Sequence, residues 1–316
     1  MTLDSNAGLN GDGVDRRGFL CCMAWAGAGV LWTMSAGLPG SRLLRAAPPA
    51  TDAIDFSFVQ ISDSHIGFSK EPYKDVSATL KLAVDNINAL PKPPAFVLHT
   101  GDLTHLAKAE EFDNVAEILK GIKTEKVFYV PGEHDVFTDD GKLFLQRFGK
   151  GTQGLGYHSF DMKGVHFVGL MNVANLKPGG MGMLGRDQLD WLKKDLAGLK
   201  DGTPIVVFDH VPLWTLSEKW GWGTADSEQA LDLMKRFPSV TVLNGHVHQV
   251  MQKVEGKVTF HTACSTAFPQ PEPGKADSPG PRKDVPAEKV RSLLGLSTVN
   301  YIEKKGMLAV TDGTLD

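Results

Sequence analysis

Five short apolar runs in this sequence are each followed closely by aspartate, glutamate or histidine, and this pattern limits the fold more than any other feature. The runs lie at 58–61, 95–98, 127–130, 205–208 and 240–243. The residues that follow them are Asp63 and His65, Asp102, Glu133, His210, and His246 with His248. Packing does not explain polar residues at five strand ends. Because the carboxyl ends of parallel strands meet at one edge of a sheet, we expect a single site there.

The segments between these runs alternate in character. Helices are predicted at 75–90, 107–122, 185–199 and 227–237, hairpins at 157–170 and 250–261, and late strands at 301–302 and 307–310. Strands that alternate with helices, followed by hairpins, favour an α/β domain with mixed sheets. The domain is expected to run from residue 55 to residue 316.

The residue types at the strand ends favour transition metals. Carboxylates combined with imidazoles suit Zn, Fe or Mn better than Ca or Mg. Seven candidate ligands are too many for one tetrahedral zinc, but they would satisfy two divalent or trivalent ions that share a bridging carboxylate. Two such ions can deprotonate a bound water and neutralise a phosphoryl group during in-line displacement. The pattern therefore predicts metal-assisted hydrolysis of a phosphoester.

Taken in order, the motifs resemble those of the calcineurin-like metallophosphoesterases. They are Asp63-x-His65, Gly101-Asp102, Gly132-Glu-His-Asp135, His210 and Gly245-His-x-His248, and the resemblance spans residues 55–265. It implies a four-layer αββα sandwich of two mixed sheets flanked by helices. By this resemblance, one metal would be held by Asp63, His65 and His248. The second would be held by Glu133, His210 and His246, with Asp102 as the bridge.

The same resemblance assigns His134 and Asp135 to catalysis rather than to metal binding. A hydroxide that bridges the two metals would attack phosphorus. His134 would contact the phosphate and help to protonate the leaving oxygen. Asp135 would orient the His134 imidazole by accepting its other N–H.

One position departs from the family pattern, because Glu133 stands where the family usually has asparagine. Glutamate adds a third negative charge beside Asp63 and Asp102, and it cannot donate a hydrogen bond to phosphate when it is ionised. The added charge favours tight cation binding, or a trivalent ion, and disfavours a monoester dianion more than a diester monoanion. Because glutamate is longer by one methylene, it is open whether Glu133 ligates at all.

The leading hypothesis is a binuclear phosphodiesterase that acts on a small phosphoester. A phosphomonoesterase or pyrophosphate hydrolase on the same site is the first alternative. A catalytically weak periplasmic metal-binding protein is the second, because Glu133 replaces the usual ligand. The net charge of −4 gives no reason to expect binding to long nucleic acid.

Several residues outside the motifs have open roles. Trp214, Trp220 and Trp222 could form an aromatic rim for a nucleobase, although packing is the simpler interpretation. His105 follows Asp102 closely and could face the substrate. Residues 268–286 are rich in proline and glycine and are expected to form a surface loop, either a disordered insert or a functional lid.

Residues 1–47 are expected to be an export signal and linker outside the domain. Arg16 and Arg17 precede a weakly apolar run at 21–38, and this order resembles a twin-arginine-type signal. That interpretation predicts a periplasmic or otherwise exported protein that interacts with the Tat export machinery. An uncleaved membrane anchor is the alternative.

Overall fold

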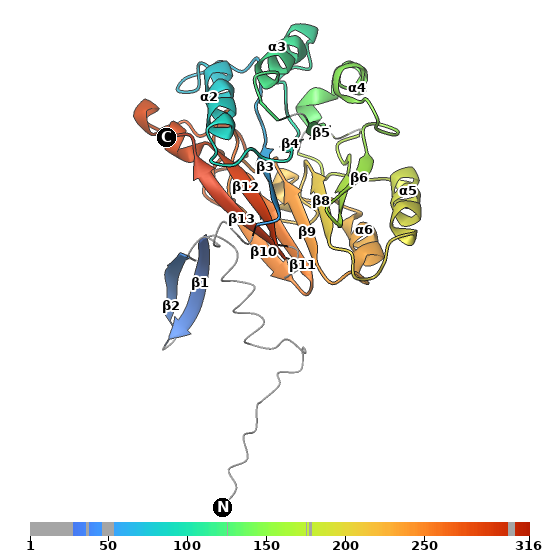
Figure 1. The fold of residues 1–316 in the computed structure, drawn as a ribbon. Coiled ribbons are helices and arrows are strands. Elements are labelled where there is room, and N and C mark those ends of the chain that lie inside the picture. The colour runs from blue at the N-terminus through green and yellow to red at the C-terminus, as the bar shows by residue number, and fades with distance from the viewer. Residues whose placement is uncertain are drawn as a thin grey trace, which may run out of the picture.

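The computed structural model describes residues 28–35, 38–45, 54–124, 126–174, 176, 179–302 and 307–316. From residue 54 on, these residues form two mixed β-sheets and the helices that cover them (Figure 1). A separate antiparallel hairpin, β1 (Ala28–Ser35) with β2 (Leu38–Arg45), pairs with neither sheet.

The first sheet has five strands in the order β13-β12-β3-β4-β5, and the second has six in the order β10-β11-β9-β8-β7-β6. The strands of the first are β3 (Phe56–Ile61), β4 (Val97–Thr100), β5 (Val127–Val130), β12 (Gly295–Ile302) and β13 (Met307–Thr314). Those of the second are β6 (His158–Met162), β7 (Val165–Gly169), β8 (Ile205–Asp209), β9 (Val240–Asn244), β10 (Met251–Glu255) and β11 (Val258–Thr262).

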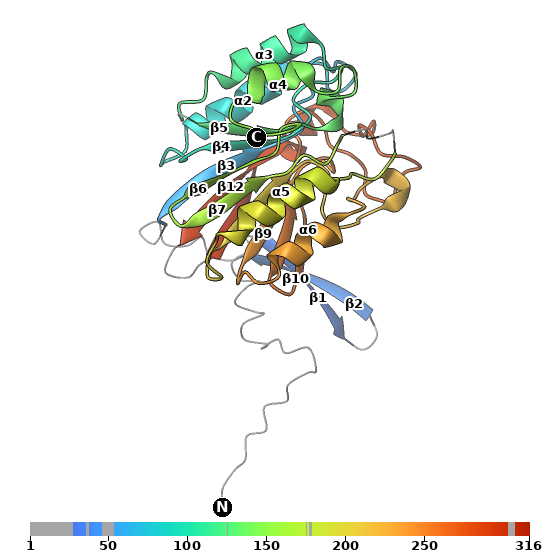
Figure 2. The same cartoon turned by 90° about the vertical axis from the view of Figure 1, so that its right-hand side faces the viewer.

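Helices lie on the outer face of each sheet. They are α2 (Val76–Asn88), α3 (Ala109–Leu119), α4 (Lys142–Phe148), α5 (Arg186–Ala197) and α6 (Ser227–Met234), with 3₁₀ turns η2 (Glu133–Asp135), η3 (Glu218–Trp220), η4 (Ala287–Lys289) and η5 (Arg291–Leu293). Helices α2, α3 and α4 lie on the five-stranded sheet, and α5 and α6 lie on the six-stranded sheet (Figure 2). The predicted αββα sandwich is confirmed.

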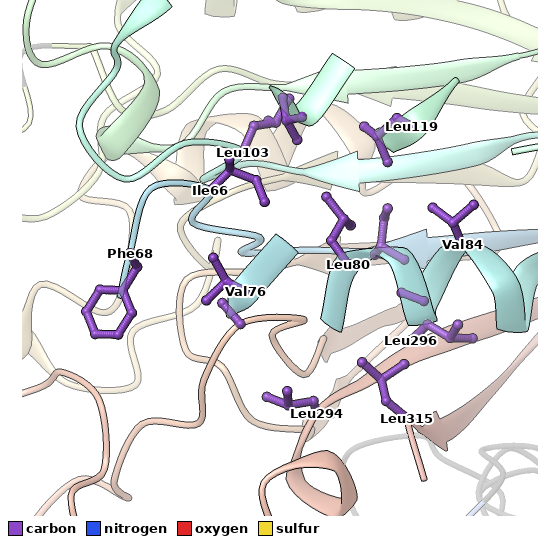
Figure 3. Close-up of a cluster of buried hydrophobic side chains, with 14 of the residues drawn as sticks. Ile66, Phe68, Val76, Leu80, Val84, Leu103, Leu119, Leu294, Leu296 and Leu315 are labelled. Carbon is purple, nitrogen blue, oxygen red and sulfur yellow. The ribbon is translucent and has the colours of Figure 1, made fainter. Parts of the chain in front are cut away.

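Three apolar cores hold these four layers together. The buried face of α2, including Leu80 and Val84, packs on the five-stranded sheet and on Leu296 (Figure 3). Leu192 of α5 and Met234 of α6 pack on the six-stranded sheet. Aromatic rings such as those of Phe58, Phe96 and Phe167 fill the space between the sheets. Burial of these alternating strand faces is the main stabilising contribution to the sandwich.

Both late strands are longer than the sequence pattern indicated, and β13 runs to Thr314 instead of ending at residue 310. β12 begins at Gly295, whereas the pattern predicted a strand only at 301–302. The polar residues Ser297, Thr298 and Asn300 hid this strand, because they interrupt its apolar alternation. Their backbone is nevertheless paired on both sides, with β3 and with β13, and the Ser297 hydroxyl donates to Asp312 at 2.6 Å.

The export interpretation depends on Arg16 and Arg17, which lie outside the described residues. Among the residues that are described, no helix is long and apolar enough to cross a membrane. Export and the Tat partner therefore stay predictions from the sequence.

Candidate metal centre

The predicted ligands follow strands that run parallel and end at one edge of the two sheets. β3, β4 and β5 pair in parallel in one sheet, and β8 and β9 do so in the other. Two hydrogen bonds tie the sheets together at this edge. Gln60 of β3 donates to the Asn244 carbonyl of β9 at 3.2 Å, and His210 Nδ1 donates to the Thr100 carbonyl of β4 at 2.7 Å. Side chains from both sheets can therefore meet there.

Five of the seven predicted ligands adopt a left-handed backbone conformation. Their φ angles are 55° at Asp63, 42° at His65, 53° at Asp102, 68° at His246 and 57° at His248. Side chains other than glycine adopt this conformation at a cost, and aspartate and histidine tolerate it better than most. Such strain concentrates at functional sites, where the surrounding structure enforces it.

Two glycines let the backbone approach the ligands closely. A Cβ added at Gly132 would lie 2.1 Å from Asp102 Oδ1, and one added at Gly245 would lie 2.6 Å from Asp63 Oδ2. Neither position can carry a side chain without displacing a carboxylate. This explains the glycine that precedes each of two ligand motifs.

The structure brings the seven predicted ligands together in two groups. The ligand atoms of Asp63, His65 and His248 all lie within 4.8 Å of one another, and so do those of Glu133, His210 and His246. Asp102 lies between the groups, because its Oδ2 is 3.5 Å from His65 Nε2 and 3.4 Å from His210 Nε2. They are two of the five overlapping groups that the described residues form, and the division of the ligands between two metals stays a prediction from the family resemblance.

Glu133 reaches the second group despite its extra methylene. Its Oε2 lies 2.9 Å from His210 Nε2 and its Oε1 lies 3.1 Å from His246 Nδ1. Both carboxylate oxygens therefore lie among the donor atoms, so the length of glutamate does not remove it from the site.

Backbone carbonyls fix the tautomers of two histidines. His210 Nδ1 donates to the Thr100 carbonyl at 2.7 Å, and His248 Nδ1 donates to the Phe268 carbonyl at 2.6 Å. A carbonyl oxygen can only accept, so each Nδ1 carries a proton, and in the neutral imidazole Nε2 is the nitrogen with the free lone pair. Second partners of this kind commonly orient metal-bound histidines.

Charge also favours cations at this edge. Asp63 and Asp102 are almost fully buried, and Glu133 lies beside them. Burial opposes ionisation of Glu133, but His246 and His210 hold its pKa well below the usual value. Burial lowers the pKa of His210, but Asp102 and Glu133 overcome this and raise it well above the usual value. Carboxylates that draw a proton onto a buried imidazole would be neutralised equally well by metal ions, so the donor set fits them.

The structure corrects the expected contact between Asp135 and His134. His134 Nδ1 donates to the His105 carbonyl at 2.7 Å, not to Asp135. The Asp135 carboxylate instead accepts from the backbone N–H groups of Leu103, Thr104 and Gly132 at 2.9–3.0 Å. These hydrogen bonds connect Asp135 to the loop that carries Asp102 and to the loop that carries Glu133. Asp135 holds two ligand-bearing loops together rather than orienting the imidazole.

His134 itself lies beside the metal ligands. Its backbone N–H donates to Asp102 Oδ1 at 2.9 Å, and one of its ring nitrogens lies within 4.8 Å of ligand oxygens of Asp102 and Glu133. Burial lowers the pKa of His134, but the charges of Asp102 and Glu133 outweigh burial and raise it.

His105 connects a predicted ligand to His134. Its Nδ1 lies 3.4 Å from His65 Nδ1, and its ring stacks on the His134 ring with centroids 4.8 Å apart and planes 17° apart. Its carbonyl also accepts the His134 N–H described above. In the sequence, only the position of His105 three residues after Asp102 pointed to the site. That position did not show whether His105 contacts a substrate or supports His65 and His134.

For the three tryptophans the structure confirms packing, the simpler of the two interpretations, and not a nucleobase rim. Trp220 and Trp222 are buried and pack against each other and Val247. Trp214 stacks on Phe260 beside the core of the six-stranded sheet. Packing is therefore their role.

The proline-rich segment 268–286 is a surface loop joined to the metal ligands. No helix or strand falls between Phe268 and Pro286. Its Gln270 side chain donates to the His246 carbonyl at 3.3 Å, and Gln249 donates to the Gln270 carbonyl at 3.0 Å. A pocket of ≈ 1090 Å³ lies between this loop and the segment that begins at His248.

The fold and this donor set define a metal-dependent hydrolase of phosphoesters. The family model for calcineurin-like phosphoesterases matches residues 56–250, and the chain belongs to that family. A probable glycerophosphodiester phosphodiesterase of Arcobacter nitrofigilis is 27% identical over 80% of this chain and 91% of its own length. A probable cyclic nucleotide phosphodiesterase of Rhodopseudomonas palustris is 25% identical over 65% of this chain and 76% of its own length. The structure of a dimetal phosphatase from Danio rerio has the same fold, with a TM-score of 0.62 and 16% identity over 83% of this chain and 99% of that one.

The two groups predict separable metal binding. We expect the wild-type protein to bind about two Mn²⁺ ions, and His248→Ala to lose affinity at one site while the other persists. Titration calorimetry on the metal-stripped protein measures both. His166→Gln is the control, because His166 pairs with Asp161 and Asp195 instead of the site. A simultaneous loss of both sites in His248→Ala would contradict two separable groups.

The contacts of His105 predict a graded effect of substitution. We expect His105→Ala to weaken Mn²⁺ binding by about tenfold, because His65 loses a neighbour that helps to orient it. Loss of such a partner usually weakens metal binding by about that factor. His105→Asn, which keeps a polar atom near the Nδ1 position, should recover part of the loss. Equal affinities in His105→Ala and wild type would show that the 3.4 Å contact supports nothing.

Proposed function

We propose that this protein is a phosphodiesterase that works with two bound metal ions and with His134 as the group that assists departure of the alcohol. The observation that carries the proposal is the pair of ligand groups that share Asp102. When bound, the ions would activate a water and offset the charge of the phosphoryl group. The chain's own residues would hold these ions, position the ester and supply a proton.

Contacts of His134 that are independent of any ligand support this role. Its Nδ1–H is committed to the His105 carbonyl, so Nε2 is the nitrogen left to face a substrate. Its backbone N–H fixes it to Asp102, which lies between the two ligand groups. A proton on Nε2 would pass to the leaving oxygen as the bond to phosphorus breaks.

The preference for a diester rests on charge. Asp63, Asp102 and Glu133 put three carboxylates at one site, and a monoester brings one more negative charge to them than a diester does. The two relatives described above carry phosphodiesterase names, which supports the same class. A monoesterase, a pyrophosphate hydrolase and a catalytically weak metal-binding protein are the competing outcomes of the tests below.

The role of Glu133 can be tested with a matched substrate pair. We expect the wild type, loaded with Mn²⁺, to prefer bis(p-nitrophenyl) phosphate to p-nitrophenyl phosphate in kcat/KM. Glu133→Asn should shift this ratio towards the monoester by about tenfold, because it removes one nearby charge. Glu117→Gln, a change of the same kind on an exposed helix surface, is the control.

Three other outcomes would overturn this account. An unchanged ratio in Glu133→Asn would remove the charge argument. Wild-type preference for the monoester would favour the monoesterase alternative. A metal-loaded wild type without turnover, together with activity gained in Glu133→Asn, would favour the metal-binding alternative.

His134 can be tested through the leaving group. We expect His134→Ala to lower kcat by about 10²–10⁴ for a diester with an alkoxide leaving group. The loss should be smaller for a p-nitrophenyl diester, because p-nitrophenolate leaves without being protonated. Metal content, measured in the same samples, should be unchanged. Equal losses on both substrates would mean that His134 holds the phosphate and is not the proton donor.

A further inference from the structure

Two exposed apolar side chains belong to the segments that carry His134 and His105. Phe137 is 56% exposed, and its ring lies 6.0 Å from the His134 ring at an interplanar angle of 89°. Leu106 is 39% exposed and directly follows His105, whose ring stacks on His134. The His134 imidazole thus has the Phe137 ring at a right angle to it and the His105 ring, which precedes Leu106, along its face.

The backbone on both sides of this pair is held in place. Val136, next to Phe137, is buried against Met171, Val173 and Val211. The N–H of Leu106 donates to Glu111 Oε2 at 2.7 Å, and this glutamate is itself buried. The Thr138 hydroxyl donates to the Ala107 carbonyl at 3.5 Å, which links the two segments. Phe137 and Leu106 therefore belong to a fixed surface and not to a free chain end.

Exposed aromatic side chains on a fixed surface gain free energy when a ligand covers them. The position of His134 indicates which part of a substrate would cover these side chains. A group that receives a proton from the His134 ring must lie next to that ring, and Phe137 contacts the same ring. A hydroxyl-rich alcohol such as glycerol would gain little from a phenyl and an isobutyl group, whereas an apolar or aromatic alcohol would bury them.

We propose that Phe137 and Leu106 are specificity-determining residues that bind an apolar or aromatic leaving group of the diester. This inference rests on the proposed function and adds the chemical class of the departing alcohol. It separates this chain from a phosphodiesterase whose leaving group is glycerol. No motif in the sequence pointed to Phe137.

The test compares dibenzyl phosphate with dimethyl phosphate. Each diester is symmetric, so the leaving group is known whichever ester bond breaks, and the two alcohols are of similar acidity. We expect Phe137→Ala to lower kcat/KM for dibenzyl phosphate by about tenfold and for dimethyl phosphate by less than about twofold. Phe137→Leu and Leu106→Ala should give smaller losses, again confined to the benzyl ester.

Val254→Ala is the matched control, because Val254 is 45% exposed and lies on β10 beside the turn at Gly256. It should change neither rate. Equal losses on both diesters in Phe137→Ala would overturn the inference and make Phe137 a support of His134. Unchanged rates on both would also overturn it. A metal-loaded wild type inactive on these diesters and on bis(p-nitrophenyl) phosphate would instead overturn the proposed function, and this inference with it.

Discussion

The site depends on three carboxylates that the fold gathers at one edge, two of them buried and the third partly exposed. Asp63 and Asp102 are buried, and Glu133 lies within contact distance of two imidazoles. Buried like charges repel strongly unless positive charge is brought between them. In the protein alone, Asp102 and Glu133 raise the pKa of His210 despite its burial, so that its imidazole can carry this positive charge. Bound cations would meet the same demand for positive charge, so at this edge metal binding is coupled to folding.

The two sheets are joined at this edge in addition to their apolar core. The segment at 246–248 sends His246 to one ligand group and His248 to the other, and each histidine also contacts the loop at 268–286 through Gln270 or Phe268. Asp135 likewise joins the loops after β4 and β5, because its carboxylate accepts hydrogen bonds from both. Gln270 and Asp135, which supply no predicted ligand atom, thus help to fix the spacing of the residues that supply one.

Periodicity was sufficient to predict an α/β domain with mixed sheets and candidate ligands at strand ends, whereas the four-layer sandwich and the division of the ligands between two metals came from the family resemblance. Buried strands show as apolar runs, and ligands at strand ends show as polar residues in fixed order. Contacts that depend on which loops meet leave no such pattern. The link from His105 to His134, the backbone partners of Asp135 and the exposed ring of Phe137 are of that kind. The tryptophans could be assigned to packing only as the simpler of two interpretations, because composition does not tell a buried indole from a rim.

The left-handed backbone at five ligand positions bears on how this protein can change by mutation. Asparagine is among the few residues that tolerate this conformation as aspartate does. Replacement of Asp63 or Asp102 by asparagine would keep the turn and most of its hydrogen bonds while removing the charge. A single substitution could therefore convert a hydrolase into a relative that keeps the fold but no longer binds its metals.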